Sequence, residues 1–135
     1  MSPKELLKQF YNADIINNNK LVEEFYHKEC ELHWNSSQGF RISKFQDILG
    51  FFKNVRENYV SIRYEMSHLL EDNDHVTSRY TVFGKPIENM DEEMPLAHYM
   101  CIWQVKDGKL YRGYQISQLA DDLAIESNSF SEIKV

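Results

Sequence analysis

The chain has 135 residues, of which 42% are hydrophobic and 13% aromatic, and its formal net charge is −6. This length suits one domain with its own apolar core, and the composition is too apolar for a disordered chain. Lysine and arginine are scattered rather than gathered into a basic stripe, so we expect no nucleic-acid partner. No apolar run is long enough for a membrane span or a secretory leader, so we expect no membrane association.

Cysteine and histidine give no sign of a metal site. The two cysteines, Cys30 and Cys101, lie far apart, and the five histidines form no pairing such as HxH or HExxH. We therefore expect neither a metal nor a cofactor. So few cysteines also favour a reduced protein in the cytoplasm.

The first part of the chain has helical periodicity. Ser2-Pro3 followed by Glu5 is typical of a helix start, because serine caps the helix and proline fits its first position. A second short helix is predicted over residues 21–26. A third is predicted to begin with a capping box of Ser43 and Gln46. Its apolar stripe has the clearest pattern in the chain and consists of Phe45, Ile48, Leu49, Phe52, Val55 and Tyr59.

After Val60 the apolar period changes to two, which is typical of strands. Asp107-Gly108 is a strong signal for a tight hairpin between two long strands. Strands are predicted over residues 31–35, 60–68, 76–83, 96–106 and 109–117. Residues 119–135 lose this periodicity, so we divide the chain into a domain over 1–118 and a partly flexible C-terminal extension over 119–135.

Helices followed by a run of strands predict an α+β fold. The chain also resembles the SnoaL-like branch of the nuclear-transport-factor-2-like superfamily, from about residue 4 to residue 118. The motifs that carry this resemblance keep the order Phe10-Tyr11, Phe25-Tyr26, the Trp34 strand, Asp74-His75-Val76 and the run from Val105 to Leu110. The resemblance implies a cystatin-like architecture, in which a cone-shaped, curved antiparallel sheet packs on three N-terminal helices and encloses an apolar pocket. The superfamily includes polyketide cyclases, ketosteroid isomerase, scytalone dehydratase and limonene epoxide hydrolase, so the fold does not assign an activity.

The resemblance and the strand alternation together predict which side chains face the cone. A register error of one residue would reverse a whole set. The predicted ligand-binding residues are Trp34, Tyr64, Met66, Tyr80, Tyr99, Cys101, Trp103, Gln115 and Ser117. His68 is predicted to point the same way.

The catalytic groups that the resemblance would imply are missing from this sequence. The two aspartates of ketosteroid isomerase fall at Trp34 and Cys101, and the ionisable groups of limonene epoxide hydrolase fall near Tyr80 and Gln115. His68 is the remaining candidate catalytic residue, because neutral imidazole can act as a base near pH 7. The alternative is a structural histidine at the rim of the sheet.

Three functions remain open. The chain could bind a small apolar or aromatic metabolite, oriented by His68, Gln115 and Ser117, since such pockets are apolar with a few placed polar groups. It could be a lyase or isomerase that uses His68 as acid and base. It could also bind a protein partner through the outer sheet face. The missing carboxylates favour binding over catalysis.

The outward face of the two longest strands is unusually apolar. A sheet with one wet face should be polar there, and an apolar patch of this extent needs a cover. A twofold axis places the same patch on both subunits, so no second protein is required. The outward set on these strands includes Met100, Ile102, Leu110, Tyr114 and Ile116. We therefore predict a homodimer in which Met100, Ile102, Tyr114 and Ile116 are buried between the subunits.

Overall fold

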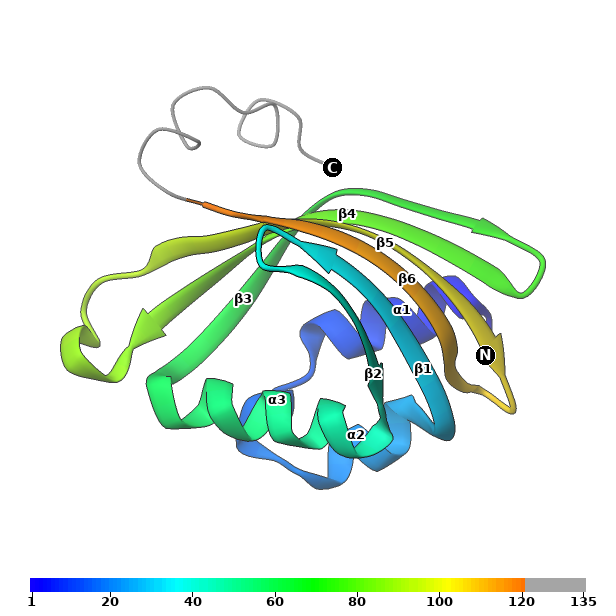
Figure 1. Ribbon diagram of the computed structural model, residues 1–135, viewed down its shortest axis with the longest axis horizontal. Coiled ribbons are helices and arrows are strands. Elements are labelled where there is room, and N and C mark those ends of the chain that lie inside the picture. The colour runs from blue at the N-terminus through cyan, green and yellow to red at the C-terminus, as the bar shows by residue number, and fades with distance from the viewer. Residues whose placement is uncertain (121–135) are drawn as a thin grey trace.

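Three α-helices lie beneath the concave side of a curved, open, six-stranded sheet (Figure 1). The computed structural model describes residues 1–120. The predicted α+β architecture, a curved sheet packed on N-terminal helices, is confirmed. The last predicted segment, over residues 119–135, begins inside the final strand, and its part from residue 121 lies outside the described residues.

The helices form close to where the sequence predicts them, with one different cap. Ser2 caps the first helix as expected, and its hydroxyl oxygen accepts a hydrogen bond from the Glu5 backbone N–H at 3.2 Å. The predicted cap at Ser43 is wrong, because the third helix starts after Lys44, whose backbone N–H donates to the Asp47 carboxylate at 2.8 Å. The helical elements are α1 (Pro3–Asn12), η1 (Ile15–Asn17), α2 (Lys20–Phe25), α3 (Phe45–Asn58) and η2 (Ile87–Asn89).

The sheet has the strand order β2-β1-β6-β5-β4-β3. Its pairs are antiparallel, except that β1 and β6 are parallel, which corrects the all-antiparallel expectation. The short strand β2, which follows the turn at Gly39, was not predicted, because its few residues carry little alternation. The strands are β1 (Tyr26–Ser36), β2 (Gly39–Lys44), β3 (Tyr59–Asp72), β4 (His75–Pro86), β5 (Met94–Lys106) and β6 (Lys109–Leu119).

A β-bulge in β3 reverses the predicted orientation of His68. Met66 pairs with Tyr80, but His68 pairs with Arg79, so Ser67 is an extra residue in the ladder. An extra residue moves every later side chain to the opposite face. His68 is therefore exposed on the convex face and does not point into the cone.

A second bulge, in β6, corrects the predicted orientation of Leu110. Gln104 pairs with Arg112 whereas Val105 pairs with Leu110, so Tyr111 is the extra residue. Leu110 is consequently fully buried, with 0% of its surface exposed, and is not part of the outward patch.

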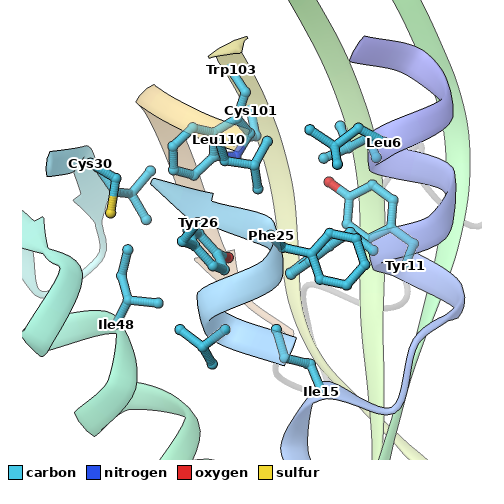
Figure 2. Packing of buried hydrophobic residues seen from close by; sticks show 14 of the residues in the cluster. Leu6, Tyr11, Ile15, Phe25, Tyr26, Cys30, Ile48, Cys101, Trp103 and Leu110 are labelled. Atoms are coloured by element: carbon cyan, nitrogen blue, oxygen red, sulfur yellow. The ribbon is translucent and has the colours of Figure 1, made fainter. Parts of the chain in front are cut away.

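The core fills the space between the helices and the concave face. Figure 2 shows Leu6 and Tyr11 of α1 and Ile48 of α3 on the helical side, with Trp103 and Leu110 on the sheet side. The predicted stripe of α3 packs into this core. Ile48 and Phe52 are buried, while Phe45, Leu49 and Val55 are partly buried against it.

Close packing above Gly113 gives a test of the fold. A Cβ atom there would lie 2.7 Å from the Trp103 ring and 2.8 Å from Leu32 Cδ1. Overpacking of this kind costs about 1–3 kcal/mol, so we expect Gly113→Ala to lower the free energy of unfolding by that amount in urea titrations.

Gly50, inside α3, provides the matched control. No heavy atom lies within 4 Å of a Cβ built on it. Alanine is the better helix former, so Gly50→Ala should raise the free energy of unfolding by about 0.5–1 kcal/mol. Equal stability of the wild type and Gly113→Ala would contradict the described packing.

Candidate functional site

A cavity of about 130 Å³ lies between the concave face of the sheet and helices α1 and α3. Most of its wall is aromatic. Six of the predicted ligand-binding residues line it, namely Trp34, Tyr64, Tyr80, Tyr99, Trp103 and Gln115. Aromatic and apolar side chains from the helices complete the wall, among them Tyr11, Phe52 and Val55. Sequence reasoning assigned these helix residues to the core, because a helical stripe does not show where the core leaves a gap.

The other predicted residues lie near the cavity without lining it. Met66 packs against the core, and Cys101 is buried with 1% of its surface exposed. Ser117 lies further out, where its hydroxyl oxygen accepts a hydrogen bond from Trp34 Nε1 at 2.8 Å. His68 is exposed, and its Nδ1 atom lies 3.0 Å from the Ser67 hydroxyl oxygen. This position favours the structural alternative over a catalytic role.

Stacked and hydrogen-bonded tyrosines hold the inner wall in place. The rings of Tyr80 and Tyr99 stack with centroids 5.1 Å apart and planes inclined by 9°. Tyr11 packs on Tyr80 at 4.9 Å, and its hydroxyl forms a 2.8 Å hydrogen bond with the buried Ser78 hydroxyl. Aromatic side chains lose little conformational entropy when they are ordered. These tyrosines therefore form an apolar wall that carries hydroxyl groups.

Burial keeps the ionisable groups around the cavity neutral. It raises the pKa of Tyr11, Tyr64 and Tyr80 well above the ordinary value, and raises the pKa of Tyr99 to about 12. The pKa of the Cys101 thiol is raised by the same cause. Within residues 1–120, the cavity wall has no carboxylate and no imidazole, and no cluster of ligating side chains could hold a metal. The phenols can therefore donate hydrogen bonds, but they cannot act as bases near neutral pH.

A wider groove of about 940 Å³ adjoins the cavity, and we call it the mouth groove. The two share five wall residues, which are Trp34, Ser43, Phe51, Tyr59 and Tyr99. The mouth groove is more polar, because it also includes Arg41, Asp47 and Ser117. An apolar interior thus opens through a polar entrance.

Comparison with known proteins assigns the chain to a family. The model of the SnoaL-like domain matches residues 7–113, so the chain belongs to the SnoaL-like family. This confirms the resemblance that the motifs indicated. No curated protein sequence matches the chain.

Several solved structures share the fold at low sequence identity. IdmH from Streptomyces antibioticus, proposed to be a polyketide cyclase, is 16% identical over 87% of this chain and 92% of its own, with a TM-score of 0.70. A protein from Acidithiobacillus ferrooxidans, also proposed to be a polyketide cyclase, is 15% identical over 97% of this chain and 95% of its own, with a TM-score of 0.68. An LEH-like epoxide hydrolase from M. tuberculosis is 10% identical over 85% and 81%, with a TM-score of 0.65. At these identities the likeness establishes the fold alone.

None of the helices within residues 1–120 is long and apolar enough to cross a bilayer.

The buried phenols predict a loss of stability at high pH. The pKa of Tyr99 is about 12 in the folded chain, against about 10 for an unperturbed tyrosine. Below pH of about 10 the phenol is protonated in both states, and its contribution to stability is fully present. As the pH rises from about 10 towards 12, the unfolded chain loses its proton first, so the free energy of unfolding falls.

Urea titrations at several pH values, with phenolate absorbance as a second signal, measure this effect. We expect Tyr99→Phe to lose stability less steeply than the wild type across the window. A wild-type free energy of unfolding that stays constant over the window would show that these phenols are not shielded from water.

Proposed function

We propose that this SnoaL-like protein binds a small apolar or aromatic molecule in the cavity. The observation that carries the proposal is a cavity with a mostly aromatic wall, on which the polar groups are all neutral. An engineered apolar cavity of about 150 Å³ takes up benzene, so a space of about 130 Å³ suits one ring, and a second ring would reach into the adjoining mouth groove.

Two polar side chains can orient such a ligand. Gln115 is buried in the cavity wall and offers both an amide donor and a carbonyl acceptor. Ser43, also buried, contributes a hydroxyl at the boundary with the mouth groove. A mostly apolar pocket with few convergent polar groups is the usual design of a small-molecule site.

The geometry supports binding better than catalysis by His68. A general base must come within hydrogen-bond reach of the proton that it removes, and His68 is exposed on the convex face, beyond the bulge at Ser67. At the positions implied by the resemblance, Trp34 and Cys101 stand where ketosteroid isomerase has its aspartates. The lyase or isomerase alternative therefore lacks its acid–base group.

Filling the cavity provides the test. Val82 lines the cavity, and phenylalanine at this position would occupy much of its volume. We expect the wild type to bind neutral one- and two-ring aromatic amides such as 2-naphthamide, and Val82→Phe to weaken this binding at least tenfold. Isothermal titration calorimetry measures the affinity, and circular dichroism verifies that the variant is folded.

Val60→Phe is the matched control, because the same substitution falls on an exposed residue outside the cavity. It should leave the affinity unchanged. Equal binding by Val82→Phe would place the ligand elsewhere, and no binding of any such amide by the wild type would contradict the proposal.

We further propose that the molecule is a cytoplasmic homodimer. Both cysteines are free and buried, which supports a reducing compartment. The dimer would form through the predicted interface residues Met100, Ile102, Tyr114 and Ile116, all four of which are exposed. They alternate along the adjacent strands β5 and β6, so their side chains share the convex face. An isologous contact covers this patch on both copies.

Multi-angle light scattering at tens of micromolar tests the dimer. We expect a dimer for the wild type and a monomer for Ile116→Lys, because lysine would bury an unpaired charge in the contact. Ile87→Lys, at an exposed apolar residue of η2 away from the patch, should remain dimeric. A monomeric wild type would favour the alternative of a different partner protein on the convex face.

A further inference from the structure

Arg41 lines the mouth groove and packs on Trp34, which lines both the mouth groove and the cavity. Arg41 on β2 is the cross-strand neighbour of Trp34 on β1, and Trp34 in turn pairs with Gln115 on β6. Directly paired residues point to the same face of a sheet. Arg41 therefore lies on the concave face, next to the wall residues Trp34 and Gln115. Its guanidinium carbon is 4.4 Å from the centroid of the Trp34 ring.

This stacking fixes the position of the charge. A guanidinium over an indole face is attracted by the ring, and the contact leaves the N–H groups at its edge free to donate. The indole is itself held by the 2.8 Å hydrogen bond from its Nε1 to the Ser117 hydroxyl oxygen. The guanidinium is therefore held in the mouth groove by an indole ring whose own position is fixed by a hydrogen bond.

Arg41 makes no ion pair with a carboxylate of the described residues, in contrast to Arg63, which is paired with Glu93 at 2.8 Å. The carboxylate of the mouth groove, on Asp47, accepts the Lys44 backbone N–H at the start of α3. The donors of Arg41 are thus available to a molecule in the groove. The Ser117 oxygen accepts from Trp34, so its own hydrogen can also donate there.

The electrostatic effect of Arg41 extends to the cavity. Burial raises the pKa of Tyr99, and the Arg41 guanidinium partly offsets that rise. Tyr99 lines both the cavity and the mouth groove. A ligand whose apolar body lies against Tyr99 would therefore have its outer end close to a positive charge.

We propose that the ligand is an amphipathic anion, an aromatic or alicyclic carboxylate, whose ring system occupies the cavity and whose carboxylate binds Arg41 and the Ser117 hydroxyl in the mouth groove. This inference rests on the proposed binding function and specifies its ligand class. Arginine suits the role because its planar fork matches both oxygens of a carboxylate. The net charge of the chain is −6, so a preference for an anion must come from a local cation rather than from the overall field.

A pair of probes with the same shape tests the assignment. 2-Naphthoate and 2-naphthamide share one ring system and differ in the charge of the head group. By calorimetry we expect the wild type to bind 2-naphthoate roughly tenfold more tightly than 2-naphthamide, the effect of one charge-assisted contact. In Arg41→Gln this preference should disappear while the affinity for 2-naphthamide stays within about twofold of the wild type.

Lys53→Gln is the charge control, because it removes an exposed positive charge of α3 that does not border the groove. It should keep the preference for the carboxylate. The preference should also shrink as salt is raised in the wild type, which provides a measurement that needs no variant.

The outcomes separate the two proposals. If the wild type binds 2-naphthamide but shows no preference for 2-naphthoate, the carboxylate assignment is overturned and the binding function stands. If Arg41→Gln weakens both probes equally, Arg41 acts by packing on Trp34, and the assignment is again overturned. If the wild type binds neither probe, the proposed binding function itself has failed.

Discussion

The structure depends on the burial of one aromatic cluster between the helices and the concave face of the sheet. Phe10 of α1 is its centre, because its ring contacts aromatic rings from α1, α2, β1, α3 and β3. These partners are Tyr11, Phe25, Tyr26, Phe52 and Tyr64, with ring centroids 5.3 to 6.5 Å apart. Four of these five pairs meet edge to face, a geometry that aromatic rings prefer. The cavity adjoins this cluster beneath the sheet, and all the rings of the cluster except Phe25 line it.

The chemistry of the site follows from the separation of apolar interior and polar entrance. In the interior, desolvation favours the neutral form of each phenol and thiol, so these groups offer hydrogen bonds but no charge. Arg41 supplies a positive charge in the exposed mouth groove, next to the Trp34 ring. Under the proposed function, such a site would select for shape inside and for charge at the entrance. Within residues 1–120, the cavity wall has no carboxylate and no imidazole that could act as a base.

Membership of the SnoaL-like family explains the architecture without assigning the reaction. Solved relatives proposed to be polyketide cyclases have TM-scores of 0.70 and 0.68 at 16% and 15% identity. At such distances the backbone persists while the side chains in the cone are free to change. The function therefore has to be argued from the residues of this chain, above all from the aromatic wall and from Arg41.

The sequence by itself determined the elements whose signals are local. The apolar stripe of α3, the cap at Ser2 and the hairpin at Asp107-Gly108 all depend on neighbouring residues, and both hairpin residues adopt the positive φ that such a turn requires. These local signals were sufficient for the α+β class, whereas the predicted part of the cavity wall came from strand alternation together with the family resemblance.

The tertiary structure decided which way side chains point beyond a bulge. Local alternation carries no information about where an extra residue enters the ladder, because that depends on the partner strand. For this reason His68 and Leu110 lie on the faces opposite to those predicted, and the pairing of β1 with β6 and of Arg41 with Trp34 emerged only when the strands were assembled.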